Sequence, residues 1–398
     1  MLVLLMGVFV LIFDQSTRVD YAPRKPNEAE YGFLNRSAGA VFAETRDLLQ
    51  EWADRYPASG QHSLIKSMQS PDDHDFESAF WELYLHEAYR RAGYQLTVHP
   101  EVPDSSKHPD FLVENGERRF YLEAVRANVS AEKLAEKRRL GEVHTVLEDL
   151  PADKFKLRFS YDAIGLQPLA TTKLRAQLMQ WLASLDPGEV IAAYTANPMY
   201  PSLPCRRFVA DGWILEFTAL PLGLESAGKG GRLVGVFGRK RASGVDNVSP
   251  LKRAVDQKAK RYGILDAPLV VAVLANTEYP TRDYQIQEAL YGVSALPPRE
   301  ASRNPSDLYQ DGHWLTRKGW RRGHAPQVIT ACDLKPWFVA RVQPRLWGTL
   351  ESEVEIPSQP PFLARVKVDG PDPAVMPAQP MSEVFGLAYG GGSGEAFR

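Results

Sequence analysis

The sequence predicts an α/β fold in which helices flank a mixed sheet. Segments with helical spacing of apolar residues alternate with short apolar strands along the chain. Pro268–Leu274 is apolar throughout, which is typical of a strand buried on both faces. A hairpin signal, Asn115–Gly116, joins two further apolar segments. Together these patterns predict helices packed on the faces of a sheet.

The first half of the chain supplies the elements around that hairpin. Apolar residues recur at helical spacing in 39–55 and, more strongly, in 75–92, where Gly93 is a normal helix stop. Three strands follow, predicted at Gln95–His99, Asp110–Glu114 and Arg119–Ala124. The predicted order is therefore helix, strand, and then strand–turn–strand.

The second half continues the alternation. We predict helices at 131–149, 172–185 and 249–262, and strands at 155–161, 213–220, 233–237 and 268–274. Ser249–Pro250 begins the last helix and Gly263 ends it, because serine caps a helix and proline is tolerated in its first turn. No linker-like stretch divides 30–345, so we expect one domain that shares a core, with an insertion around 130–245.

The two ends of the chain differ from its middle. Residues 1–29 are expected to form an N-terminal extension, and its first 13 residues are apolar without interruption. As a helix, those 13 would reach about 20 Å, short of the ~30 Å hydrocarbon core, which disfavours a membrane anchor. A buried segment, a translated upstream stretch, an anchor and a signal peptide all stay open. Residues 346–398 are rich in proline and glycine and are expected to be a tail.

Cysteine usage bears on the compartment. The two cysteines, Cys205 and Cys332, exclude a disulfide framework and a thiolate zinc site. Such sparse usage fits a reducing compartment, and we expect a cytoplasmic protein. The oligomeric state stays open, and a homodimer is one alternative.

Charge narrows the function classes. The net charge is −2, from 47 Lys and Arg against 49 Asp and Glu, which argues against a protein that is basic throughout. The range 229–261 nevertheless carries ten basic residues against two acidic ones, and a second basic patch surrounds a tryptophan. Basic side chains that bind backbone phosphates, together with an aromatic ring that stacks on a base, are typical of nucleic-acid-binding surfaces. The expected contact residues are Arg239, Lys240, Arg241, Lys252, Arg253, Arg317, Trp320 and Arg321. Ordinary surface charge is the alternative.

Two carboxylates at the hairpin indicate the chemistry. Asp110 opens one strand, and Glu123 lies near the far end of its partner, between apolar residues. A carboxylate is costly among apolar strands unless something pairs with it. Two of them on adjacent strands form the hard-oxygen site that Mg²⁺ prefers, with water and phosphate oxygens as further ligands. Such an ion activates water and neutralises the charge that develops in phosphoryl transfer.

This arrangement resembles the PD-(D/E)xK nuclease superfamily. Its restriction-endonuclease-like core has a helix with a glutamate, a strand, Pro-Asp, and then Glu-x-Lys on the next strand. Pro109–Asp110 matches the first half, and Glu123 matches the acidic residue of the second. The resemblance covers 76–126, where the chain looks like a branch of actinobacterial hypothetical proteins. It implies a Mg²⁺- or Mn²⁺-dependent endonuclease that hydrolyses DNA, with the carbonyl of Ala124 as a further metal ligand.

One position departs from the family pattern. The lysine of Glu-x-Lys is Val125 here, and Arg126 points to the opposite face of a regular strand because side chains alternate. We expect Lys258 to replace that lysine and to touch phosphate or the attacking water. It shares a helix face with Tyr262 at i, i+4 spacing. The alternative is that Lys258 belongs to the solvated face of an amphipathic helix.

The helix glutamate of the family has three candidates, Glu77, Glu82 and Glu87. The family pattern favours Glu82, which we rank first. A helical wheel places Glu87 on an apolar face, where a carboxylate is the more unusual residue. Because the strand lysine is absent, a second hypothesis stays open, namely a catalytically inactive nucleic-acid-binding or scaffold protein on the same fold.

Overall fold

The computed structural model of the chain divides into two compact units. The first unit comprises 1–22, 29–128 and 246–398, and the second comprises 23–28 and 129–245. Within these ranges the structure describes residues 10–25, 27–103, 105–127, 131–150, 154–197, 202–222, 234–239, 246–277, 280–292, 311–316, 318–320, 325–348, 360–368 and 373–387. Each unit is treated by itself below.

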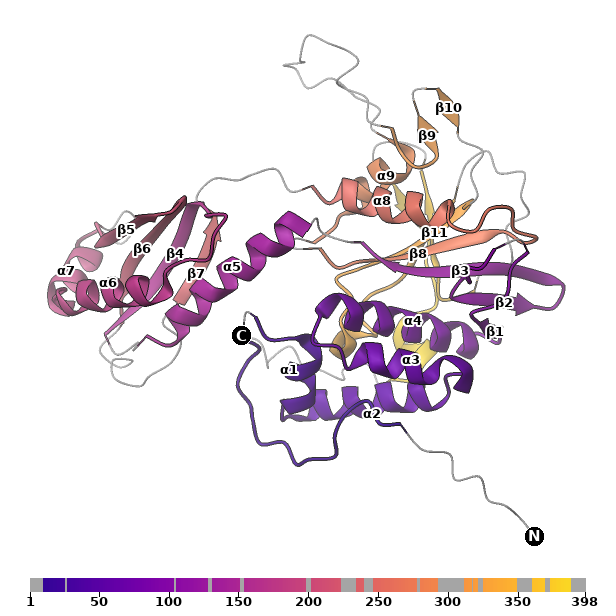
Figure 1. Cartoon of the computed structure of the whole chain (residues 1–398), viewed down its shortest axis with the longest axis horizontal. Coiled ribbons are helices and arrows are strands. Elements are labelled where there is room, and N and C mark those ends of the chain that lie inside the picture. The colour runs from indigo at the N-terminus through magenta and orange to yellow at the C-terminus, as the bar shows by residue number, and fades with distance from the viewer. Residues whose placement is uncertain are drawn as a thin grey trace. The chain divides into compact units, whose positions relative to one another are not determined.

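An eight-stranded mixed sheet is the centre of the first unit (Figure 1). Its strands, in spatial order, are β1 (Gln95–Val98), β2 (Phe111–Asn115), β3 (Arg118–Arg126), β8 (Leu269–Ala275), β11 (Gln327–Cys332), β12 (Arg345–Gly348), β13 (Ala364–Lys367) and β14 (Ala374–Val375). The central strands β3, β8 and β11 are parallel to one another. Antiparallel β1 and β2 extend the sheet beyond β3, and antiparallel β12 extends it beyond β11. Every residue of β8 is buried, as its apolar sequence predicts.

Helices cover both faces of this sheet. They are α1 (Glu30–Arg36), α2 (Ala40–Asp54), α3 (Ala58–Met68), α4 (Asp73–Arg91), α8 (Val248–Ala259), α9 (Asp283–Tyr291), the 3₁₀ turn η2 (Pro336–Phe338) and α10 (Met381–Phe385). A small hairpin of β9 (Leu315–Thr316) and β10 (Gly319–Trp320) completes the unit. Figure 1 shows α2 to α4 on one side of β3 and β8, with α8 and α9 on the other. Trp81 of α4 shares a core with Val270, whereas Val255 of α8 shares a second core with Val271. The predicted mixed sheet between helices is confirmed.

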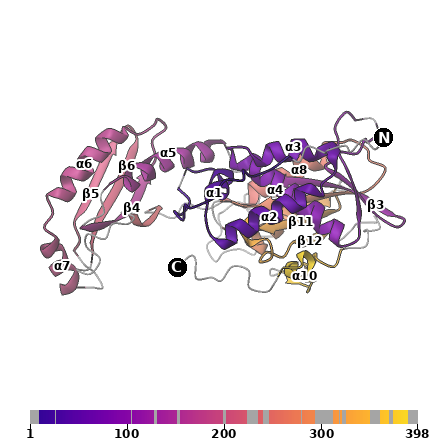
Figure 2. The ribbon, with the colours of Figure 1, turned by 90° about the horizontal axis from the view of Figure 1, so that it is seen from below.

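The second unit has its own sheet and its own core. Its elements are α5 (Ala131–Glu148), β4 (Phe155–Ala163), α6 (Thr171–Ala183), α7 (Pro187–Ala196), β5 (Cys205–Ala210), β6 (Trp213–Pro221) and β7 (Val234–Arg239). The strand order is β5-β6-β4-β7, and α6 lies alongside this sheet (Figure 2). Leu157 of β4 packs in one cluster with Val143 of α5 and Leu174 of α6. The range that we expected to be an insertion therefore has a separate core rather than sharing one with the first unit.

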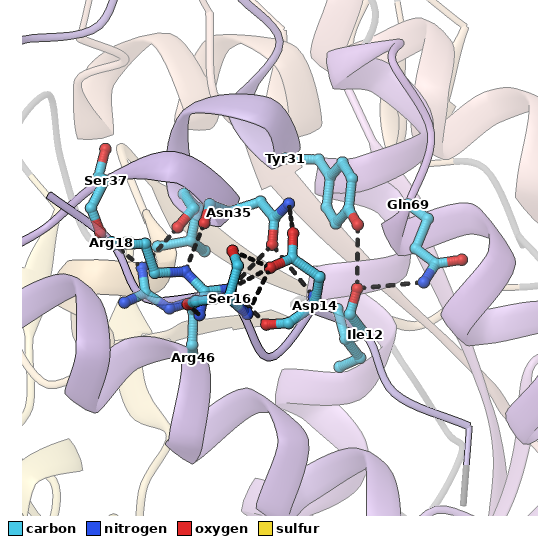
Figure 3. A network of polar contacts seen from close by, with 10 residues as sticks. Ile12, Asp14, Ser16, Arg18, Tyr31, Asn35, Ser37, Arg46 and Gln69 are labelled. Carbon is cyan, nitrogen blue, oxygen red and sulfur yellow. Dashed lines mark hydrogen bonds and ion pairs between the residues drawn. The ribbon is translucent and has the colours of Figure 1, made fainter. Parts of the chain in front are cut away.

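Hydrogen bonds hold the N-terminal segment to helices of the first unit (Figure 3). Ile12 is fully buried, and its carbonyl accepts a hydrogen bond from the Tyr31 hydroxyl at 3.1 Å. Arg18 donates to the carbonyl of Asn35 at 2.7 Å. The end of the apolar N-terminal run thus joins the core, whereas residues 1–9 lie outside the described residues. None of the described helices is long and apolar enough to span a bilayer.

The segment that we predicted to be a C-terminal tail contributes to the first unit where it is described. β13 pairs with β12, and β14 pairs with β13. Phe362 is fully buried, and the ring of Phe385 in α10 lies 4.6 Å from that of Trp52. Proline is compatible with this arrangement because edge strands and the turns between them need few ladder N–H groups.

Candidate active site

Glu123 is the centre of a buried ionic cluster, with a side chain only 1% exposed. It lies opposite Val271 in the register of β3 and β8, and Val271 belongs to the core under α8. One carboxylate oxygen accepts a hydrogen bond from Lys258 Nζ, and the other accepts one from the Tyr262 hydroxyl. Arg261 Nη1 lies 3.6 Å from the first oxygen. Three residues at and just beyond the end of α8 therefore surround one buried carboxylate.

The structure brings Lys258 to Glu123 although 135 positions separate them in the sequence. Lys258 lies in the last turn of α8, and its side chain is 20% exposed. The Tyr262 hydroxyl also donates to the carbonyl of His108 at 3.2 Å, which fixes the end of α8 against the loop before β2. The geometry thus matches the expectation that a lysine from this helix lies beside the strand glutamate.

Arg126 does not take that place. β3 runs beside β8 in unbroken register, so the side chain of Arg126 points away from the face that carries Glu123. Its guanidinium instead donates to the carboxylate of Glu77 on α4. This regular register agrees with the expectation that Arg126 points to the face opposite Glu123.

Asp110 directly precedes β2 and lies next to Glu123. Phe111 pairs with Leu122 across the hairpin, which puts Asp110 at the level of Glu123. The backbone N–H of Ala124 donates to Asp110 Oδ2 at 2.7 Å, so the hairpin itself orients this carboxylate.

The pKa of Asp110 is raised well above its usual value. Burial is the largest cause, and the negative charges of Glu123 and Glu82 add to it, while Lys258 and the bond from the Ala124 N–H oppose it. Ionising Asp110 is therefore costly as long as no additional positive charge is close. A cation bound beside these acids would relieve the repulsion.

Glu82, our first choice for the helix glutamate, belongs to the same cluster. Its carboxylate accepts a hydrogen bond from the buried hydroxyl of Tyr56, which follows α2. Burial raises the pKa of Glu82, and the charge of Glu123 adds to that effect. The bond from Tyr56 and the neighbouring side chains of His99 and Lys258 oppose it. Glu82, Asp110 and Glu123 thus form an acidic cluster that also contains Lys258 and Arg261.

Glu87, our second choice, lies elsewhere. Its fully buried carboxylate accepts hydrogen bonds from Arg55, Arg90 and Arg91. Burial alone would favour the neutral acid, but these three guanidinium groups outweigh it and lower the pKa of Glu87 to about 2. Glu87 therefore lies on an apolar face of its helix because it belongs to a structural cluster with three arginines, and it is not part of the acidic cluster.

A Mg²⁺ ion fits the donor chemistry of Asp110 and Glu123. Among the described residues there is no group of three or more His, Cys, Asp or Glu side chains that could hold a metal ion. Mg²⁺ is commonly held by only one or two carboxylates, with waters and substrate phosphates as the other ligands. The mutual repulsion of these two acids is the observation that favours a cation here. The ligand role of the Ala124 carbonyl stays a prediction.

The predicted nucleic-acid contacts are described only in part. Arg253 is exposed on α8, whereas Lys252 donates to Asp256 at 2.8 Å. Arg239 ends β7 of the second unit and Trp320 ends β10 of the first, with only their backbones described. The remaining four lie outside the described residues: Lys240, Arg241, Arg317 and Arg321.

Sequence reasoning missed several members of the acidic cluster. Arg261 was counted only among the cations of 229–261 that were expected to bind phosphates, Tyr56 was not singled out, and His99 was given no role in the site. No local pattern identifies the last two, because they reach Glu82 from segments before α3 and after β1. Tyr262 carried a usable signal, since its spacing from Lys258 places both on one helix face.

Comparison of the chain with protein-family models, with curated proteins and with solved structures finds no match. The likeness to the nuclease superfamily therefore stays a prediction from the motif.

Proposed function

We propose that the protein is a Mg²⁺-dependent nuclease of the PD-(D/E)xK type, which hydrolyses phosphodiester bonds of DNA on a restriction-endonuclease-like fold. The observation that supports this most is the contact of Lys258 with Glu123 beside Asp110. A lysine, two strand carboxylates and a helix glutamate are the parts that this chemistry needs, and here they come from α8, the β2–β3 hairpin and α4. The raised pKa values of Asp110 and Glu82 support a cation site here.

In this proposal each residue has a separate task. Asp110 and Glu123 hold the metal ion, which would act as a Lewis acid and supply an activated water when bound. Lys258 donates a hydrogen bond from Nζ, either to orient the attacking water or to offset the negative charge that develops on a phosphate oxygen. Tyr262 keeps the Glu123 carboxylate oriented through its hydroxyl. Glu82 contributes a further carboxylate to the same cluster, where it would orient water.

DNA would lie against the exposed cations at the end of α8. The side chain of Arg261 is 41% exposed while it remains 3.6 Å from Glu123, so it spans the distance from the cluster to solvent. Arg253, which lies on the same helix, is exposed as well. Both would contact backbone phosphates, which gives affinity without base specificity.

The test is cleavage by the purified full-length chain. We expect Mg²⁺- or Mn²⁺-dependent cutting of plasmid, linear duplex or single-stranded DNA. Asp110→Asn should abolish it, and Lys258→Met should lower the rate at least about 100-fold, the scale of losing one charge-stabilising donor. Asp266→Asn is the matched control, because this half-exposed acid binds Arg119 and accepts a hydrogen bond from the Tyr121 hydroxyl at 2.8 Å. Cutting that survives Asp110→Asn at the wild-type rate would refute the site.

A non-catalytic nucleic-acid-binding protein is the second candidate. It is favoured by the saturation of Glu123, since Lys258 and Tyr262 together engage both of its carboxylate oxygens. On that hypothesis the protein binds DNA but cuts none of the three substrates with either metal. Binding without cutting by the wild-type chain would therefore select this candidate.

A further inference from the structure

A small polar pocket adjoins the acidic cluster. It lies between α3 and α4 and has a volume of about 160 Å³. Glu82 lines it, so this residue belongs to both the pocket and the cluster. His99 also lines it, and the backbone N–H of His99 donates to the carbonyl of Asp110 at 3.0 Å. The pocket is therefore next to the atoms at which we propose that cleavage occurs.

The lining of this pocket is polar but holds neither lysine nor arginine among the residues described. It offers three hydroxyls, two imidazoles and a second acid, from Ser63, Ser67, Ser78, His74, His99 and Asp75. A phosphate would require cationic side chains or clustered N–H donors. Hydroxyls and carboxylates instead suit a neutral ring with an exocyclic amine, because a carboxylate accepts from that amine. Imidazole rings add a surface on which a base can stack.

We propose that this pocket takes one unstacked, amine-bearing base (adenine, cytosine or guanine) of the substrate strand, next to the cut. Its volume is below the ~300–1,000 Å³ of sites for whole small-molecule ligands, so it matches a base better than a complete nucleotide. A base can enter only from a single strand or after leaving the duplex stack. This inference rests on the proposed function, because it assigns the base side of the same substrate.

The experiment measures binding rather than cutting. Fluorescence anisotropy with the wild-type chain in EDTA compares short single strands of dA, dC, dT and an abasic backbone of equal length. We expect dA and dC to bind about ten-fold more tightly than dT and the abasic strand, the scale of one stacked and hydrogen-bonded base. Ser67→Leu fills the pocket and should remove that preference. Lys66→Leu, at the neighbouring exposed position of α3, should keep it.

Each outcome decides one of the two proposals. Equal binding of the four strands, or a preference that survives Ser67→Leu, would overturn the base pocket. If Ser67→Leu loses the preference and Lys66→Leu keeps it, the base pocket is supported. If the wild-type chain then cuts no DNA with Mg²⁺ or Mn²⁺, only the nuclease proposal fails. Cutting without base preference would leave the nuclease and remove the pocket.

Discussion

Two ionic groups meet strand β3 at Glu123 and at Arg126, whose side chains point to opposite faces of the sheet, and the two groups are built differently. The acidic cluster holds three carboxylates against Lys258 and Arg261. On the other face lies a paired network of Glu30, Glu77, Arg126, Asn276 and Lys335. There the Glu77 carboxylate accepts from Arg126, from Asn276 Nδ2 at 3.2 Å and from Lys335 Nζ at 2.5 Å. The paired network matches two acids with two bases, and the acidic cluster does not.

The pKa shifts have opposite signs in the two groups. Burial favours the neutral acid at Glu77, but the charges of Lys335 and Arg126 outweigh it and lower the pKa. At Asp110 burial and two neighbouring acids act together and raise the pKa. A matched network supports the fold, whereas an excess of acid costs stability and is retained where a cation or substrate is to bind. Replacing an acid by its amide should therefore lower the free energy of unfolding in the paired network and raise it in the acidic cluster.

The largest effect on stability is expected at the paired network. Glu77→Gln leaves the cations of Arg126 and Lys335 without their shared acid. We expect the free energy of unfolding to fall by about 3 kcal/mol, as when one partner of a buried ion pair is removed. Urea unfolding of Glu77→Gln, compared with that of the control Asp266→Asn, measures this loss of stability. A loss no greater than that of the control would show that the network does not support the fold.

Glu87 gives a smaller effect with a clear pH dependence. Glu87→Gln should lower the free energy of unfolding by about 2 kcal/mol, because its arginine partners stay partly solvated. Its folded pKa of about 2 lies below the ordinary 4.5, so its stabilisation is complete above about pH 4.5 and is lost as the pH falls toward 2. The difference between wild type and variant should therefore shrink from pH 6 to pH 3. A constant difference would contradict the ionic origin.

The smallest effect, with the opposite sign, is expected at the acidic cluster. The raised pKa of Asp110 means that the folded state takes up its proton more readily than the unfolded state. Ionising Asp110 therefore lowers stability as the pH rises above the ordinary value of 3.8. Asp110→Asn removes that cost, and its amide oxygen can still accept from Ala124. We expect a gain of about 1 kcal/mol in EDTA at neutral pH. A loss like that of Glu77→Gln would erase the contrast between the two groups.

The sequence predicted those parts of the site that local patterns encode. Asn115–Gly116 predicted the hairpin, whose register then places Asp110 beside Glu123. The apolar run of β8 predicted a central strand, and helical spacing predicted α4 and α8. The expectation that Lys258 replaces the strand lysine came instead from the family resemblance and from its i, i+4 spacing with Tyr262.

The remaining parts depend on contacts that no local pattern encodes. Of the three arginines at Glu87, only Arg55 belongs to this class, because it reaches Glu87 from just beyond the end of α2. Arg90 and Arg91 follow Glu87 at i+3 and i+4, a spacing that the sequence does show. Lys335 joins Glu77 over 258 positions, which no spacing rule anticipates. The C-terminal strands were hidden by their prolines, because composition does not distinguish an edge strand from a tail.

Metal binding to the isolated protein shows whether the acidic cluster holds a metal ion. Isothermal titration with Mn²⁺ compares the wild-type chain, Asp110→Asn and the control Asp266→Asn, without substrate and without reference to cleavage. We expect the wild type and the control to bind Mn²⁺ with the same affinity, and Asp110→Asn to bind it at least about 10-fold more weakly, the scale of one lost ligand contact. Equal binding by all three chains, or no binding by the wild type, would contradict the assignment of the acidic cluster as a metal-dependent active site.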